Sequence, residues 1–98
     1  MKLDTSLCIQ ILTQLKPIIQ EEFKVKSMSL FGSTARGDQQ EDSDVDILVE
    51  MPPKFILLSK LHELLEENLG KRVDLIRRHS HLSEVFLSII SKDEISIF

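Results

Sequence analysis

The segment from residue 44 to residue 76 constrains the fold of this chain more than any other. Its first part, DVDILVEM, places Val45, Ile47 and Val49 on one face of an alternating pattern and therefore predicts a strand. Two prolines end that strand, and the leucines that follow recur at helical spacing up to a capping glycine, Gly70. The run RVDLI then predicts a second strand. Strand, helix and strand in this order form a crossover, so the two strands are expected to be parallel.

Helices and strands are also expected on both sides of this crossover. They are predicted at residues 4–23 (helix), 25–31 (strand), 82–90 (helix) and 95–98 (strand), with a short helix after Gly32. Pro17 is expected to kink the first helix or to start a second segment there. This order of elements predicts an α/β sandwich, in a single domain over residues 1–98.

Composition narrows the class of protein. The chain has 98 residues, of which 42% are hydrophobic and 29% charged, as in soluble globular proteins. No apolar run approaches the ~18 residues that a membrane span needs. The single cysteine, Cys8, is expected in the core and indicates a reducing compartment, for which the cytoplasm is the default. A net charge of −4 and the absence of Trp and Tyr argue against direct nucleic-acid binding.

Three aspartates are the first candidates for chemistry. Asp44 and Asp46 are two residues apart on a predicted strand, so their side chains share a face and lie ~6.5–7 Å apart. Such a pair alone is more often the solvated face of a strand. Asp74 lies between apolar neighbours on the adjacent strand of the crossover, where an acid needs a partner. Because Mg²⁺ prefers carboxylates and substrate phosphates, the three acids together favour a metal site.

A glycine and a serine, Gly32 and Ser33, come directly after the strand predicted at residues 25–31. A glycine that closes a strand before a short helix exposes backbone N–H groups, and the serine adds a hydroxyl; such groups bind phosphate oxygens. By itself a Gly-Ser pair more often marks an ordinary strand-to-helix turn. Arg36 follows one turn later, where it reaches a phosphate or faces solvent.

Two other motifs do not fit. The run GSTARGD lacks the lysine of a P-loop at the required spacing. Acids at positions 42, 44 and 46 match a calcium-binding loop, but Ile47 stands where that loop needs glycine.

A few further side chains are considered as candidates for metal binding or partner contact. His62 is expected to be exposed on the polar side of the helix in the crossover, and His79 and His81 are expected to be loop residues rather than metal ligands. Phe55 and Ile56 precede the leucine stripe and exceed what one helix face needs, which suggests a partner surface.

The spacing of these motifs resembles the signature of the polymerase-beta-like nucleotidyltransferase superfamily, in which ten residues separate Gly-Ser from Asp-x-Asp. The segments LFGSTARGD, SDVDILVE and LGKRVDLI are most similar to its minimal nucleotidyltransferases, small antitoxins encoded beside HEPN-domain toxins. The resemblance covers about residues 20–78 and implies a small mixed sheet of about four strands packed with helices.

The resemblance also implies a mechanism. Its catalytic residues and the ligands of two Mg²⁺ ions are Asp44, Asp46 and Asp74, and its nucleotide-binding residues are Gly32, Ser33 and Arg36. AMP would pass from ATP to a tyrosine hydroxyl of a HEPN RNase toxin, with release of pyrophosphate. Because the chain is short and has no Tyr, the acceptor is expected on a partner. The alternative is an antitoxin that blocks the toxin by contact alone.

Overall fold

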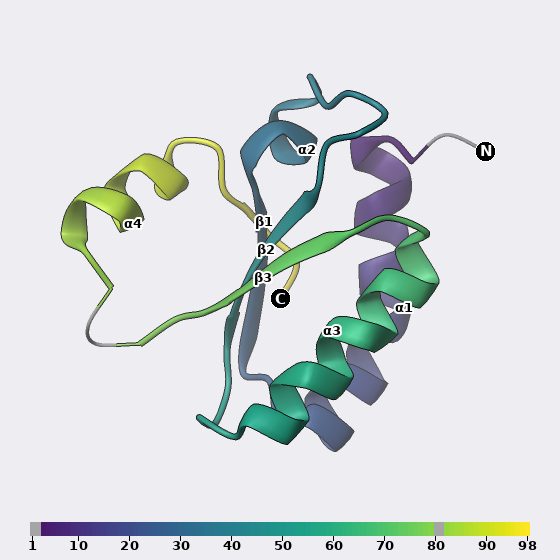
Figure 1. Ribbon diagram of the computed structural model, residues 1–98, viewed down its shortest axis with the longest axis vertical. Coiled ribbons are helices and arrows are strands. Elements are labelled where there is room, and N and C mark those ends of the chain that lie inside the picture. Colours follow the sequence, from purple (N-terminus) through teal and green to yellow (C-terminus); the bar gives the residue numbers. More distant parts are fainter. Residues whose placement is uncertain (1–2, 80–81) are drawn as a thin grey trace.

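A four-stranded mixed sheet lies at the centre of the molecule in the computed structural model, which describes residues 3–79 and 82–98 (Figure 1). The elements are α1 (Thr5–Phe23), β1 (Ser27–Phe31), α2 (Gly32–Arg36), β2 (Val45–Glu50), α3 (Phe55–Leu69), β3 (Val73–Arg77), α4 (Glu84–Ser91) and β4 (Ile95–Ser96). Their predicted order is confirmed. Within the described ranges, no helix is both long and apolar enough to cross a lipid bilayer.

The strands lie in the order β3-β2-β1-β4. The two strands of the crossover, β2 and β3, are parallel as predicted, and β1 is antiparallel to both of its neighbours. The last strand is shorter than expected, because regular pairing covers only Ile95 and Ser96. Beyond it, the N–H of Ile97 still donates to the carbonyl of Met28 at 2.8 Å.

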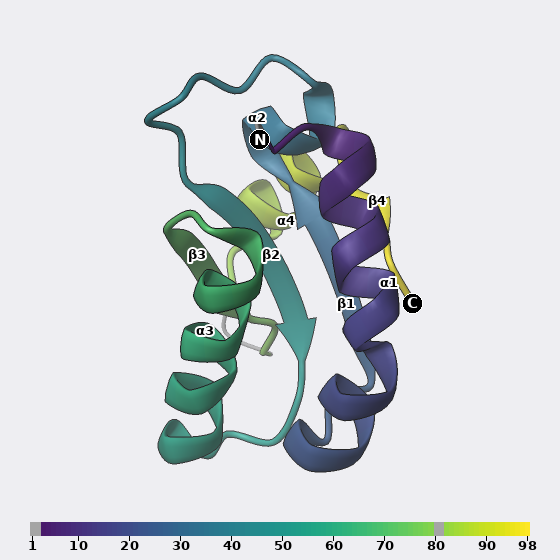
Figure 2. The ribbon, with the colours of Figure 1, turned by 90° about the vertical axis from the view of Figure 1, so that its right-hand side faces the viewer.

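Helices α1 and α3 lie side by side on one face of the sheet and cover its main core (Figure 2). Val45, Ile47 and Val49 point into this core and are at most 1% exposed, which confirms the predicted buried face of β2. They meet Leu12 of α1 and Leu61 of α3, both fully buried. The leucine stripe of the crossover helix therefore covers the sheet, as the sequence pattern predicts.

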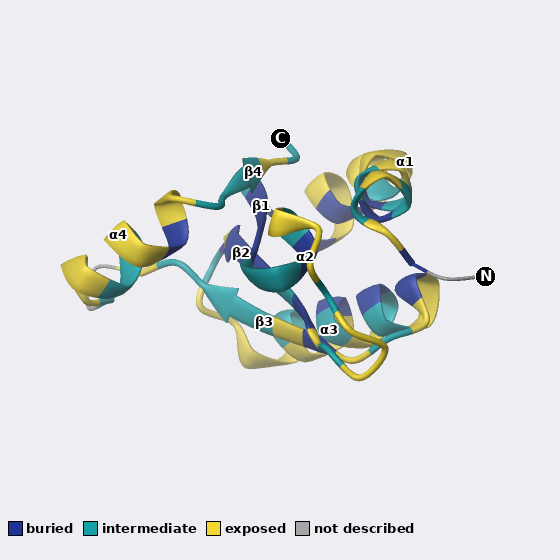
Figure 3. Cartoon of the chain, turned by 90° about the horizontal axis from the view of Figure 1, so that it is seen from above, coloured by how far each residue is buried: buried dark blue, intermediate teal, exposed yellow. Residues whose placement is uncertain are grey.

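Helix α4 packs against part of the opposite face of the sheet and stands away from the other helices (Figure 3). Leu48 and Phe31 contribute to a smaller cluster there with Ile90 and Phe86 of α4. Asp46 lies on this second face, because it alternates with the buried residues of β2. The acids predicted to do chemistry are thus on the side that the two long helices leave uncovered.

Helix α1 is continuous through Pro17, so the prediction of a second segment there is wrong. Asp4 caps the helix by accepting a hydrogen bond from the N–H of Leu7 at 2.7 Å. Pro17 removes one hydrogen bond of the helix from an exposed position. Leu12 and Ile19, on either side of it, are both fully buried against the sheet, and this packing keeps the helix in one piece.

Candidate active site

The glycine motif and the aspartate motif come into direct contact. Phe31, the last residue of β1, is paired with Asp46 of β2, so Gly32 begins α2 directly beside the Asp46 side chain. Gly32 has φ +72°, and a Cβ added there would overlap the Asp46 carboxylate and lie 3.1 Å from its Cγ. Only glycine allows this close approach without displacing the acid.

The structure brings two of the three predicted acids together on adjacent strands. Asp46 and Asp74 are paired residues in the parallel register of β2 and β3. Asp44 precedes β2, and its carboxylate forms an ion pair with Arg72, with Oδ1 3.3 Å from Nε. Both side chains of that pair are largely exposed, at 46% for Asp44 and 79% for Arg72.

Negative charge is concentrated at Asp46. Burial raises the pKa of Asp46, and the charges of Asp74 and Asp44 raise it further, while Arg36 partly offsets the effect. Over residues 3–79 and 82–98, no three His, Cys, Asp or Glu side chains are arranged as a ready-made metal site. The Asp44 carboxylate points to Arg72 instead, so the predicted metal cluster would need this one exposed side chain to change its partner.

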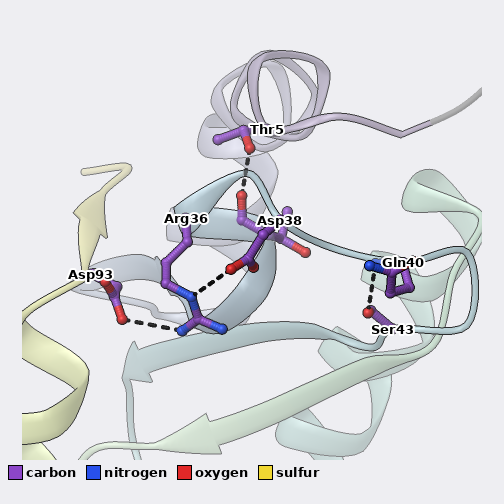
Figure 4. Close-up of polar contacts among 7 residues, drawn as sticks. Thr5, Arg36, Asp38, Gln40, Ser43 and Asp93 are labelled. Carbon is purple, nitrogen blue, oxygen red and sulfur yellow. Dashed lines mark hydrogen bonds and ion pairs between the residues drawn. The ribbon is translucent and has the colours of Figure 1, made fainter.

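The predicted phosphate-binding residues lie in and beside α2. In the part of the chain that the structure describes, the Ser33 hydroxyl makes no hydrogen bond and is partly exposed, so it is available to a ligand. Arg36 is already engaged: its guanidinium lies 3.2 Å from Asp38 and 3.2 Å from Asp93 (Figure 4). The hydrogen bonds to these carboxylates raise the pKa of Arg36. Its predicted contact with a phosphate stays a prediction.

The nucleotidyltransferase domain family matches residues 12–98, a range that includes every predicted site residue. This chain belongs to that family. The matched range contains the four strands, α2 and the three acids.

Curated relatives of this nucleotidyltransferase carry the name protein adenylyltransferase. One from Methanocaldococcus jannaschii is 48% identical over 75 residues, which cover 72% of this chain and 75% of the relative. The protein adenylyltransferase MntA of Thermococcus cleftensis is 42% identical over 82 residues, or 82% of this chain and 83% of MntA. The chain is a minimal nucleotidyltransferase of the protein adenylyltransferase group.

Solved structures share the fold of the nucleotidyltransferase. A minimal nucleotidyltransferase has 25% identity and a TM-score of 0.76, with 95% of both chains covered. A toxin–antitoxin complex with AMP-PNP has 24% identity and a TM-score of 0.70, with 88% of this chain and 72% of that one covered. A complex of an MNT antitoxin with tri-AMPylated HEPN toxin from Shewanella oneidensis has 21% identity, a TM-score of 0.64, and coverage of 92% and 71%. The predicted fold is confirmed.

His62 is a residue whose role the sequence did not predict. It was expected to be simply exposed, but its Nε2 atom lies 2.7 Å from the carbonyl oxygen of Val73 on β3. Glu66, one turn further along α3, accepts a hydrogen bond from the N–H of Val73 at 2.9 Å. In the sequence, only the four-residue spacing between this histidine and the acid, beside the leucine stripe, could have indicated that the two side chains act together.

The remaining predicted side chains are accounted for in part. Phe55 and Ile56 are exposed, at 82% and 68%, as expected for residues that exceed the needs of the core. His79 is an exposed residue outside the regular elements, as predicted, and His81 lies outside the described residues.

Proposed function

We propose that this nucleotidyltransferase transfers AMP from ATP to a tyrosine hydroxyl of a HEPN-domain toxin and acts as its antitoxin. The observation that carries the proposal is the pairing of Asp46 with Asp74 on adjacent strands, with Gly32 in contact with Asp46. The names of the relatives, and the solved complexes that contain AMP-PNP or an AMPylated toxin, support the same chemistry.

The nucleotide is assigned to the side of the acids that α2 borders. The triphosphate approaches the main-chain N–H groups at the start of α2, beside the Asp46 carboxylate that fills the space at Gly32. The Ser33 hydroxyl then donates a hydrogen bond to a phosphate oxygen. Arg36, whose charge partly offsets the raised pKa of Asp46, exchanges Asp38 or Asp93 for a phosphate oxygen.

Two Mg²⁺ ions are the cofactor that we propose, held by Asp44, Asp46 and Asp74. The donor set fits, because burial and then the charges of Asp74 and Asp44 raise the pKa of Asp46, and a hard cation stabilises carboxylates placed in this way. Asp44 can leave Arg72 readily, since an ion pair this exposed contributes ~0–1 kcal/mol. When bound, the ions supply positive charge that offsets the triphosphate and lowers the pKa of the acceptor hydroxyl.

The acceptor approaches from the side of Asp74, on the strand at the edge of the sheet. The Asp74 carboxylate receives the proton of the tyrosine hydroxyl. The tyrosine oxygen attacks the α-phosphorus, forming a new P–O bond, and the bond between the α-phosphorus and the bridging oxygen breaks to release pyrophosphate. The chain itself has no Tyr, which fits transfer to a partner.

The fully buried thiol of Cys8 fits the reducing cytoplasm that we propose as the location of the protein.

The test is a transfer assay with ATP labelled at the α- or the γ-phosphate, Mg²⁺ and the HEPN-domain protein that co-purifies with the chain. Label from α-labelled but not γ-labelled ATP should appear on the partner. The Asp44→Asn/Asp46→Asn variant should lose at least ~10³-fold of this activity, because the acids that hold the cations are gone.

The matched control is Glu41→Gln/Asp42→Asn, which removes the same charge from exposed positions in the preceding loop and should keep full activity. The alternative is an antitoxin that acts by contact. It would be established if the Asp44→Asn/Asp46→Asn variant still neutralised the toxin completely and the unaltered chain transferred no label.

A further inference from the structure

A groove lies along the outer edge of β3, away from the side of the acids to which we assign the nucleotide. Strand β3 lies at the edge of the sheet, and within residues 3–79 and 82–98 it pairs with β2 alone. A cavity of about 320 Å³ lies between β3 and α3, lined by Phe55, Leu58, Ser59 and His62 and by residues 73–75. This volume is in the range of sites that bind ligands or side chains. Phe55, which lines it, is 82% exposed.

The hydrogen bonds of β3 show which main-chain groups face this groove. The carbonyl of Arg72 accepts from β2 at 2.9 Å, and the N–H of Arg78 donates to β2 at 2.7 Å. Alternate residues of a parallel strand bond to the same neighbour, so the even-numbered residues face β2. The main-chain groups of Val73 and Leu75 therefore point outward.

Side chains of α3 already occupy the outward groups of Val73. Its N–H donates to Glu66, and its carbonyl oxygen lies 2.7 Å from His62. These two side chains take the place of a neighbouring strand and protect this end of the edge. Leu75 has no such cover: among the residues described, nothing bonds its outward N–H and C=O.

We propose that an extended segment of the acceptor protein adds to β3 at Leu75 and so delivers its hydroxyl to the acids. This inference rests on the proposed transferase function. In an added strand, successive side chains point to opposite faces of the sheet. One side chain enters the groove against Phe55, and its neighbour lies over the face of Asp46 and Asp74, one strand spacing of ~4.8 Å from Asp74. The segment that fits is a tyrosine flanked by an apolar residue.

The first test compares Phe55→Ser with Val85→Ser. Each position is exposed in the first turn of its helix, α3 or α4, and of the two only Phe55 lines the groove. With the co-purified HEPN-domain protein as acceptor, Phe55→Ser should raise the KM for the acceptor roughly tenfold, because one apolar contact is lost. Its KM for ATP should not change. Val85→Ser should behave as the unaltered chain, and equal kinetics for both variants would overturn the proposal.

The second test follows amide exchange by NMR in the labelled chain, bound to the unlabelled HEPN-domain protein. The amide of Leu75 should exchange at least ~10-fold more slowly in the complex, because it gains an acceptor from the added strand. The amide of Val73, already bonded to Glu66, should change little. A complex in which Leu75 exchanges as in the free chain would contradict strand addition.

These two tests separate the groove from the chemistry. If the chain binds its partner and protects Leu75 but transfers no label, strand addition is supported and the transferase function is contradicted. If the chain transfers label with no protection of Leu75, the transferase function is supported and strand addition is contradicted.

Discussion

At the scale of single residues, the contact between Gly32 and Asp46 joins the phosphate side of the site to its acids. Gly70, at the end of α3, has nearly the same φ, +68° against +72°, yet apart from its own neighbours in the chain no described residue comes within 4 Å of a Cβ placed there. Substitutions at the two glycines can therefore distinguish the effect of backbone strain from the effect of steric overlap with the acid.

Gly32→Ala is expected to lower nucleotidyl transfer by ~100-fold, because the new methyl group displaces the Asp46 carboxylate by a sizeable fraction of an ångström. Gly70→Ala should reduce the free energy of unfolding by ~1 kcal/mol through backbone strain and leave transfer intact. Denaturant unfolding and the labelled-ATP assay measure the two effects. Equal activity of both variants would mean that the overlap at Gly32 is relieved without moving the acid.

Cys8 predicts how stability depends on pH. Its side chain is fully buried, and burial raises the pKa of the thiol from 9.0 to about 11. Between these values the unfolded chain loses the proton while the folded chain keeps it. The free energy of unfolding should therefore fall as pH rises from 9 to 11, by up to ~1.4 kcal/mol per pH unit.

The matched variant is Cys8→Ala, which loses some packing at every pH but has no thiol to ionise. The difference in stability between the two chains, from urea unfolding at pH 8, 9, 10 and 11, should shrink as pH rises. A difference that stayed constant over this range would show that the thiol does not ionise on unfolding.

At the scale of elements, α3 both covers the sheet and protects its edge. Its leucines face the core, while Glu66 and His62 satisfy the outward main chain of Val73. Edge strands that expose such groups are sites of self-association.

Glu66→Ala should lower the free energy of unfolding by ~1–2 kcal/mol, because the N–H of Val73 loses its acceptor. The Val73 amide should also exchange faster, and the chain should self-associate at high concentration in sedimentation experiments. Glu67→Ala removes the same kind of side chain from an exposed neighbouring position and should do none of this. If both variants behaved alike, the hydrogen bond to Val73 would not protect the edge.

At the scale of the whole molecule, local patterns predicted most of the architecture. The alternation over residues 45–50 fixed which face of β2 is buried, and the leucine spacing fixed the face of α3. The crossover then placed Asp74 beside Asp46, which the register confirms. The acids were predictable because chain direction and strand alternation determine their position without any knowledge of distant contacts.

Features that depend on distant parts of the chain were not predictable in the same way. Arg36 pairs with Asp93, 57 residues away, because α4 returns across the second face of the sheet. His62 bonds to the edge of β3 across the gap between helix and sheet, and periodicity alone assigned it to solvent. Pro17 fails to divide α1 because buried neighbours hold the helix, a tertiary effect that overrides a local rule.

The overlap between a Cβ at position 32 and the carboxylate at position 46 also has a meaning for descent. A related protein without Asp46 would no longer need glycine at position 32, and one with a side chain at position 32 could not hold the acid in the same place. Positions 32 and 46 should therefore covary among related sequences. The presence of both residues should distinguish active transferases from relatives that act only by binding.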